Sequence, residues 1–153
     1  MPEAVINRRT RIFLMRNGKF LVMVRRFADN NAVLLPGGGV ESNETFEQAI
    51  VRELKEELSF TLDTKPKQIH TWVNERQPHP GELKKWPAAQ LIRDEYYFYQ
   101  HNLRYSDVIE VSEEEKDKFI TIAFIFPHEL NKIASQYNAT VGPAIEEALQ
   151  RLV

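Results

Sequence analysis

Three consecutive glycines, Gly37, Gly38 and Gly39, precede a helix-like segment that carries five glutamates. Carboxylate oxygens are the ligands that hard divalent cations such as Mg²⁺ prefer. Glycines let the backbone approach a ligand closely, and a loop that enters a helix offers free N–H groups to anions. Taken alone, the glycines would also fit a plain tight turn. Together with the glutamates, they predict a site for a metal ion and phosphate.

The glutamates fall on the side of this segment that a helix would bury. With Phe46 as the origin and about 100° per residue, the apolar residues at every fourth position lie between about 0° and 120°. Glu53 and Glu57 lie at about −20° and 20°, inside this arc, and Glu56 lies at its edge, at about −80°. Carboxylates that face a core without compensation are costly or become protonated. The spacing therefore favours a bound cation over the alternative, a solvated helix face.

The composition limits the class of protein. The chain has 153 residues, of which 42% are hydrophobic and 27% charged, which predicts one domain, 1–153, with a sizeable core. The net charge of −2 gives no basic excess, so we expect neither nucleic acid nor a membrane surface as a partner. A short basic cluster, Arg8, Arg9 and Arg11, is expected to be a solvated face.

The chain has no cysteine, which excludes disulfides, thiolate nucleophiles and cysteine zinc sites. This fits a reducing compartment. The longest apolar run, "ITIAFIF", is far shorter than the ~20 residues that span a bilayer. We therefore expect a cytoplasmic protein.

Strands and helices elsewhere in the chain must position the acidic segment. Asn17-Gly18 predicts a hairpin turn between two strands within 8–27. The acidic helix is expected to begin at Glu44 or Thr45, with Asn43 as its cap. A short strand is predicted over 32–35, ended by Pro36 and the glycines, and further strands over 67–76, 91–103 and 119–127. Loops are predicted over 77–90 and 104–118, and helices over 127–137 and 141–153. This order indicates an α/β fold in which helices pack on one mixed sheet.

The glycines and the acidic helix together resemble the Nudix box. Gly38 opens the pattern, Glu44 follows after five residues, and Arg52 and Glu53 follow after seven more. The run "RELKEE" supplies the remaining acidic positions, and Ser59 stands where the family usually has glycine. The resemblance implies the Nudix fold over the whole chain, an α/β/α sandwich with a mixed β-sheet between helices.

The resemblance also implies an activity, hydrolysis of a nucleoside diphosphate linked to another group, with Mg²⁺ or Mn²⁺ as the cofactor. Glu44 and Arg52 would brace the loop and the helix in the catalytic machinery. The implied metal ligands are Gly38, Glu53, Glu56 and Glu57. A bound ion would neutralise the diphosphate and lower the pKa of a bound water, from which a carboxylate removes a proton.

The identity of that general base is open between a carboxylate of the box and one from a later segment. Glu53 is the candidate within the box. Glu113, Glu114 and Glu115 precede the strand expected over 119–127, in a region that supplies the base in some relatives. Asp94 and Glu95 interrupt an aromatic strand, where alternation sends them to opposite faces. At most one of these last two would therefore face the site.

The substrate is expected to be a small-molecule nucleotide, most of all a (d)NTP or damaged dNTP. Trp86 is the aromatic candidate for stacking on its base, because it lies in the Pro-rich segment 77–90, and Gly37, Gly38 and Gly39 would contact its phosphates. The alternatives are an ADP-ribose or nucleotide-sugar pyrophosphatase and a non-catalytic nucleotide-binding module. An isoprenoid diphosphate isomerase is disfavoured because that branch usually relies on a cysteine. Many members are dimers, so a homodimer is one expectation.

Overall fold

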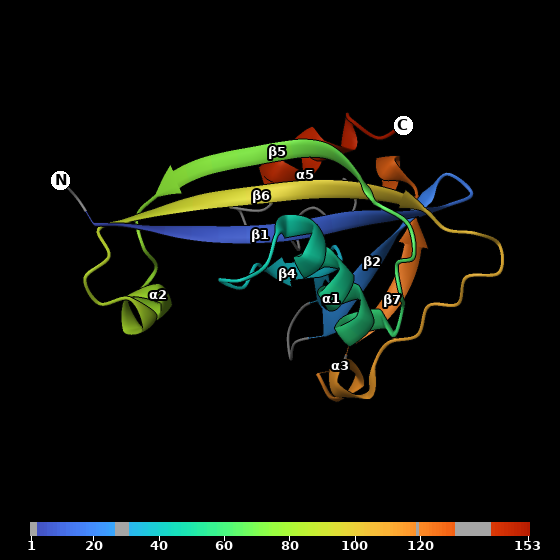
Figure 1. The fold of residues 1–153 in the computed structure, drawn as a ribbon, viewed down its shortest axis with the longest axis horizontal. Coiled ribbons are helices and arrows are strands. Elements are labelled where there is room, and N and C mark those ends of the chain that lie inside the picture. The colour runs from blue at the N-terminus through green and yellow to red at the C-terminus, as the bar shows by residue number, and fades with distance from the viewer. Residues whose placement is uncertain (1–2, 27–30, 119, 131–141) are drawn as a thin grey trace.

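The computed structural model of the protein describes residues 3–26, 31–118, 120–130 and 142–153. One sheet forms its centre, with the strand order β3-β2-β1-β6-β5, while β4 pairs with β1 and β7 pairs with β2 (Figure 1). The strands are β1 (Ala4–Arg16), β2 (Lys19–Arg26), β3 (Asn31–Leu34), β4 (Gly37–Gly39), β5 (Lys67–Arg76), β6 (Leu91–Asn102) and β7 (Ile120–Ile125). β1 and β6 run parallel and the other pairs antiparallel, so the sheet is mixed, as predicted.

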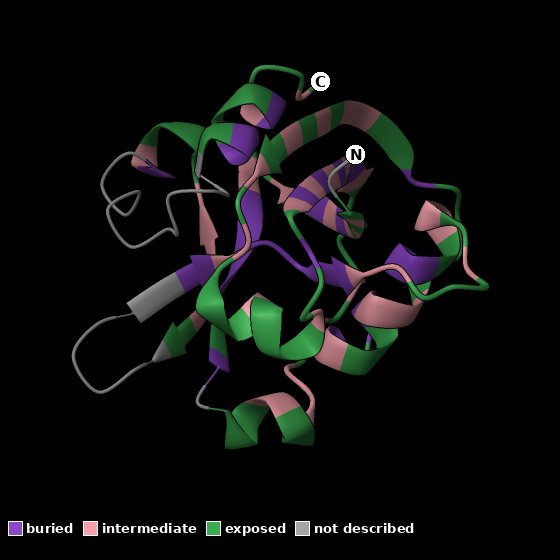
Figure 2. Ribbon diagram, turned by 90° about the vertical axis from the view of Figure 1, so that its left-hand side faces the viewer, coloured by how far each residue is buried: buried purple, intermediate pink, exposed green. Residues whose placement is uncertain are grey.

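Helices cover the two faces of this sheet. Along β1, Ile12 and Leu14 point into a core beneath α1 (Phe46–Leu58), whereas Phe13 points into a second core beneath α5 (Gly142–Leu149). Figure 1 shows α1 in front of the sheet and α5 behind it, and Figure 2 shows the bands of different burial that alternate along the strands. The α/β/α sandwich is confirmed.

The turn between β1 and β2 is the predicted hairpin. Asn17 and Gly18 both have positive φ, 53° and 76°, which suits a two-residue turn of the type that matches strand twist. The turn brings Met15 opposite Phe20.

The start of α1 differs from the expectation. Thr45, not Asn43, is the N-cap: its hydroxyl accepts from the N–H of Gln48 at 3.1 Å, and the Gln48 side chain accepts from the N–H of Thr45 at 2.9 Å. This reciprocal pair satisfies two free donors at once, which a lone Asn43 cap would not. The helix therefore begins at Phe46, and at its other end Ser59 adopts φ 51° and ends it in the left-handed region.

Two segments expected to be loops contain short helices. α2 (Pro80–Lys85) lies within 77–90, with Pro80 in its first turn, and α3 (Glu113–Asp117) lies within 104–118, with Ser112 as its cap. Of the helix predicted over 127–137, the structure describes only a 3₁₀ turn, η1 (Pro127–Glu129), and residue 130; 131–137 lie outside the described residues. None of the described helices has the length and apolarity needed to cross a membrane.

Candidate active site

The three glycines form strand β4, which lies antiparallel to β1. Gly37 has φ +136°, and a Cβ there would collide with the carbonyl of Thr10 on β1. A Cβ on Gly38 would collide with the carboxylate of Glu53, whereas Gly39 has open space on that side. Glycine at the first two positions therefore lets β4 pack against β1 on one side and receive a glutamate from α1 on the other.

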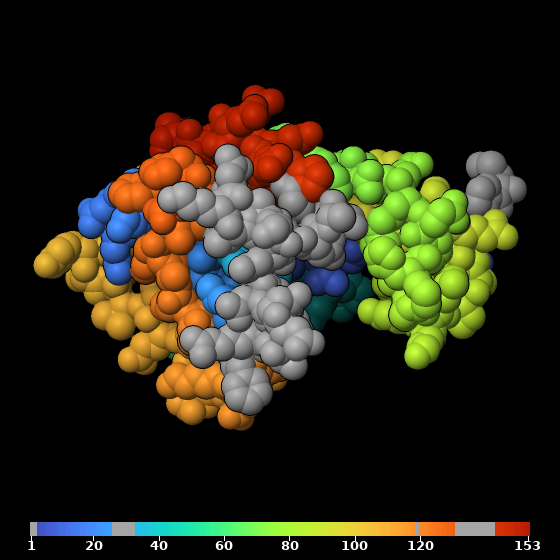
Figure 3. All heavy atoms as spheres, turned by 180° about the vertical axis from the view of Figure 1, so that it is seen from behind, coloured from blue at the N-terminus to red at the C-terminus, as the bar shows by residue number. Residues whose placement is uncertain are grey.

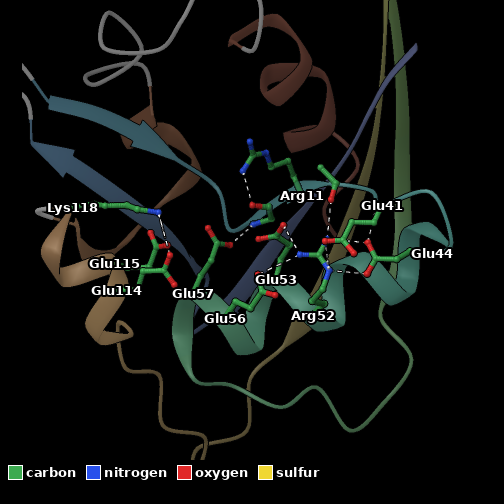
Figure 4. Close-up of polar contacts among 12 residues, drawn as sticks. Arg11, Glu41, Glu44, Arg52, Glu53, Glu56, Glu57, Glu114, Glu115 and Lys118 are labelled. Atoms are coloured by element: carbon green, nitrogen blue, oxygen red, sulfur yellow. Dashed lines mark hydrogen bonds and ion pairs between the residues drawn. The ribbon is translucent and has the colours of Figure 1, made fainter. Parts of the chain in front are cut away.

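Arg52 joins the glycine strand to the acidic helix (Figure 4). Its Nε and Nη2 donate to the two carboxylate oxygens of Glu44 at 2.7 and 2.8 Å, and Nη2 also donates to the carbonyl of Gly39 at 2.9 Å. Nη1 donates to Glu53 at 3.1 Å and to Glu56 at 3.2 Å. The hydrogen bond from Arg52 lowers the pKa of Glu44, which keeps this brace charged.

Glu53 and Glu57 point from α1 toward β4, as the helical spacing predicted (Figure 4). Glu57 Oε1 accepts from the N–H of Gly37 at 2.9 Å, and Glu53 lies against Gly38. Burial raises the pKa of Glu57 to about 8 against the opposing effects of the Gly37 N–H and of Arg11, and burial also raises the pKa of Glu53 against Arg52. Glu56 is more exposed, with 58% of its side chain accessible.

These side chains line a cleft of about 360 Å³. Gly37, Gly38 and Gly39 form part of its wall, and Glu114, Glu115 and Lys118 enter it from α3 and the residues that follow. Lys118 Nζ lies 3.6 Å from Glu115 and 3.9 Å from Glu114. Glu115 is 13% exposed and lies close enough to Glu57 to raise its pKa. The structure thus brings together the glycines, the acids of the box and two of the later acids.

Three of the acids predicted as candidates for the general base do not line this cleft. Asp94 is fully buried and holds Asn7 and Arg76 by hydrogen bonds. Glu95 faces the other side of the sheet from Asp94, where Arg8 and Arg93 each lie 3.8 Å from it, and neither acid lines the cleft. Glu113 is 90% exposed and pairs with Lys116.

Trp86 is also absent from the residues described as lining the cleft. It caps the C-terminus of α2, and its ring lies under Lys85 Nζ at 4.6 Å. Figure 1 shows α2 at the far end of β1 from α3, which borders the cleft.

Arg11 belongs to the site, although its position in a basic cluster indicated a solvated face. It lines the cleft, where its Nη1 donates to the carbonyls of Leu35 and Gly37 at 3.0 and 3.1 Å. Gly37 is therefore held through its N–H by Glu57 and through its carbonyl by Arg11. The signal in the sequence was alternation: Arg9 and Arg11 share a face of β1 with buried Phe13, whereas Arg8 is exposed at the end of the face that carries Ile12 and Leu14.

The donor set suits a hard divalent cation. Among the described residues, no three acidic or histidine side chains converge closely enough to hold an ion as they stand, because Glu53 and Glu56 are turned to Arg52. Two buried carboxylates with raised pKa nevertheless face one cleft, and a divalent cation would offset the cost of charging them. Their chemistry fits Mg²⁺ or Mn²⁺ once Glu56 leaves Arg52.

Comparisons with known proteins agree with this geometry. The NUDIX domain model matches residues 6–144. One similar solved structure is a MutT protein from Bacillus halodurans, with 12% sequence identity and a TM-score of 0.66; the match covers 94% of this chain and 82% of that one. Another is a MutT NUDIX hydrolase from Burkholderia pseudomallei, with 18% identity and a TM-score of 0.58; the match covers 97% of this chain and 99% of that one. A third is the dihydroneopterin triphosphate pyrophosphohydrolase of E. coli, with 19% identity and a TM-score of 0.58; the match covers 97% of this chain and 93% of that one. The sequence has no match among curated proteins.

The sandwich with an acidic helix against a glycine strand is the architecture of an enzyme that acts on phosphoric anhydride bonds. With a family match over residues 6–144, the chain belongs to the NUDIX family. The protein is thus a Nudix pyrophosphohydrolase.

Proposed function

We propose that this protein is a Mg²⁺- or Mn²⁺-dependent pyrophosphohydrolase that acts on a nucleoside triphosphate, including a damaged dNTP. The observation that carries the proposal is the pair of buried carboxylates, Glu53 and Glu57, which lie against the backbone of Gly37 and Gly38 in one cleft. Glu53 shares Arg52 with Glu44 and Glu56, and Glu57 forms no ion pair within the described residues. Burial raises the pKa of both carboxylates, so charging them is costly in the space that a phosphate chain and its cation would share.

Each group of the site has a proposed role. The metal would be held by Glu53, Glu56, Glu57 and the carbonyl of Gly38, and when bound it supplies charge neutralisation, polarisation of phosphoryl oxygens and an acidified water. Arg52 orients Glu53 and Glu56 and ties them to Glu44 and to the glycine strand. Arg11 and Glu57 hold Gly37 in the conformation that opens the strand to the substrate.

We assign the general base to Glu115. Its carboxylate lines the cleft, is 13% exposed and lies near Glu57. Glu53, the other candidate, already accepts from Arg52 and is a proposed metal ligand, which leaves it less free to remove a proton. Glu114 also lines the cleft but is 80% exposed, so water screens it more.

A turnover screen tests the proposed function. Nucleoside triphosphates, damaged dNTPs, ADP-ribose and nucleotide sugars would be incubated with the protein and Mg²⁺, and released phosphate or pyrophosphate would be measured. We expect release from triphosphates, its loss with EDTA and its recovery with excess Mg²⁺. Turnover that is indifferent to the chelator contradicts the metal role. Nucleotide binding without release from any substrate would support the alternative, a non-catalytic binding module.

We further propose a cytoplasmic location, one domain over 1–153 and a homodimer. These rest on the composition of the chain and on the habits of the family. Size-exclusion chromatography with light scattering tests the dimer, for which the expected mass is twice 17.9 kDa.

A further inference from the structure

Two arginines of β1 lie along the glycine strand. Arg9 is paired in register with Gly39 and Arg11 with Gly37, and both line the cleft with the acidic helix. They share the face of β1 that carries Phe13, the side of the sheet that α5 covers. Figure 3 shows this side, with α5 above, α2 at the right and dark-blue atoms of β1 visible between them.

These two guanidinium groups lack carboxylate partners. Within the described part of the chain, no ion pair involves Arg9 or Arg11, whereas Arg8, Arg52 and Arg76 each have at least one. Arg9 makes a single hydrogen bond, from Nε to Asn7 at 3.4 Å. Arg11 uses Nη1 for two carbonyls, and its Nε and Nη2 have no hydrogen-bond partner among the described residues.

The positive charges of Arg9 and Arg11 also repel one another. Both side chains are partly buried, and burial together with the charge of Arg9 lowers the pKa of Arg11. Two neighbouring cations that are partly desolvated and unpaired are stabilised by an anion between them. On the opposite side of the strand, Arg8 is exposed and pairs with Glu95, so the arrangement is specific to one face.

Tyr96 adds a third donor. Tyr96 is the register partner of Arg9 on β6 and the residue is 5% exposed, and its hydroxyl forms no hydrogen bond with the described residues. Arg11 and Arg9 are the charges that act on it most. A phenolic hydroxyl at this place can donate a hydrogen bond to a bound oxyanion.

We propose that Arg9, Arg11 and Tyr96 form an anion subsite that binds a phosphoryl group of the substrate beyond the two phosphates of a diphosphate ester. The proposal rests on the proposed function and narrows its substrate class. Two guanidinium forks and a hydroxyl match the oxygens of a phosphoryl group. A neutral ribose or sugar at this position would leave both cations unpaired. The subsite therefore selects nucleoside triphosphates over ADP-ribose and nucleotide sugars.

ATP and ADP-ribose provide a matched pair of substrates, since they share the ADP moiety and differ in the group attached to it. We expect R9M to lower the ratio of kcat/KM for ATP to that for ADP-ribose at least tenfold, mainly through KM for ATP. Y96F removes only the hydroxyl and is expected to lower the same ratio by a smaller factor. The control is R8M, which removes an arginine one residue away on the other face and is expected to leave the ratio unchanged.

Binding of tripolyphosphate, measured by titration calorimetry in EDTA, separates this proposal from the proposed function. We expect the wild type and R8M to bind it with the same Kd, and R9M at least tenfold more weakly. If no nucleotide is hydrolysed but Arg9-dependent binding is seen, the proposed function fails and the subsite stands. If R9M and R8M match the wild type in both measurements, the subsite is overturned; circular dichroism confirms that each variant is folded.

Discussion

At the scale of single residues, Glu57 combines burial with a hydrogen bond to the glycine strand. Its raised pKa, about 8, means that the folded, metal-free protein gains stability from this group while it is protonated. That contribution is complete below the unfolded pKa of 4.5 and is lost as the pH rises through about 8. A bound divalent cation removes the penalty, so Glu57 links metal binding to stability.

The variant E57Q tests this link. Glutamine can still accept from the N–H of Gly37 but carries no charge. We expect the Mg²⁺-dependent turnover to fall by at least about 100-fold, with an equal or higher melting temperature in EDTA at pH 8 and a smaller rise on adding Mg²⁺. The control is E47Q on the same helix, because Glu47 faces Lys65 and not the cleft. Wild-type turnover in E57Q would count against the metal assignment.

The assignment of Glu115 makes a separate prediction at this scale. E115Q is expected to lower kcat by roughly 10²- to 10³-fold with little change in KM, because a general base acts in the chemical step. E113Q is the matched control, since Glu113 lies on the same short helix but is 90% exposed. Equal effects of the two substitutions would return the role to Glu53.

At the scale of elements, the three adjacent glycines of strand β4 have different surroundings, so we expect a substitution at each to have a different effect. G37A places a Cβ against the Thr10 carbonyl at φ +136°, so we expect it to lower the free energy of unfolding by about 2–3 kcal/mol. G38A displaces the Glu53 carboxylate and is expected to abolish turnover in a folded protein. G39A meets open space and should resemble the wild type. Urea unfolding and turnover of all three variants check this order, which a uniform response would contradict.

Helix α2 is attached to the sheet by one arginine. Arg76 donates to both oxygens of Glu82 at 2.7 and 2.9 Å and to buried Asp94 on β6 at 2.8 Å. The hydrogen bonds from Arg76 hold the pKa of Glu82 at about 2. Because this pKa is lowered, the contribution of Glu82 to stability is present above the unfolded value of 4.5 and is lost as the pH falls toward 2.

Thermal unfolding between pH 7 and pH 2 tests this attachment with E82Q. At pH 6–7 we expect the wild type to be more stable by about 1–2 kcal/mol, and we expect the difference to vanish near pH 2. E75Q is the control, because Glu75 is half exposed and meets Arg93 only at 3.4 Å. A difference between wild type and E82Q that does not change with pH would contradict the ion pair as its source.

At the scale of the whole molecule, periodicity predicted the sheet, the acidic helix and the side of that helix that reaches the glycines. The prediction succeeded because apolar residues such as Ile50 and Leu54 recur at the helical period on the side of the helix that is buried. The short helices α2 and α3 were missed because each has no buried residue, so no apolar pattern marks them. Helix α2 is joined to β6 through Arg76, which contacts Asp94 only when β5 and β6 pair.

The site was predictable to the extent that it is local in sequence. Glu44, Arg52, Glu53 and Glu57 lie within fourteen residues and meet on one helix and the loop before it. Choosing among the later acids required the path of the chain, which brings Glu115 to Glu57 and places Glu95 on the α1 side of the sheet beside Glu44 and Phe46, outside the cleft. Alternation along β1 placed Arg11 on the same face as Phe13, but its partners are backbone carbonyls, which the sequence alone does not identify.

The parallel pairing of β1 with β6 has a kinetic consequence. Its register joins Ala4 to Leu91 and Met15 to Asn102, so the centre of the sheet closes only between segments far apart in the chain. Such pairing has a high loop-closure entropy and places folding in the millisecond-to-second range rather than the microsecond range. On the ribosome, β1 would emerge long before β6, and the edge of β1 that pairs with β6 would stay unpaired until β6 is synthesised. A nascent chain halted before residue 91 should therefore remain protease-sensitive and in need of a chaperone.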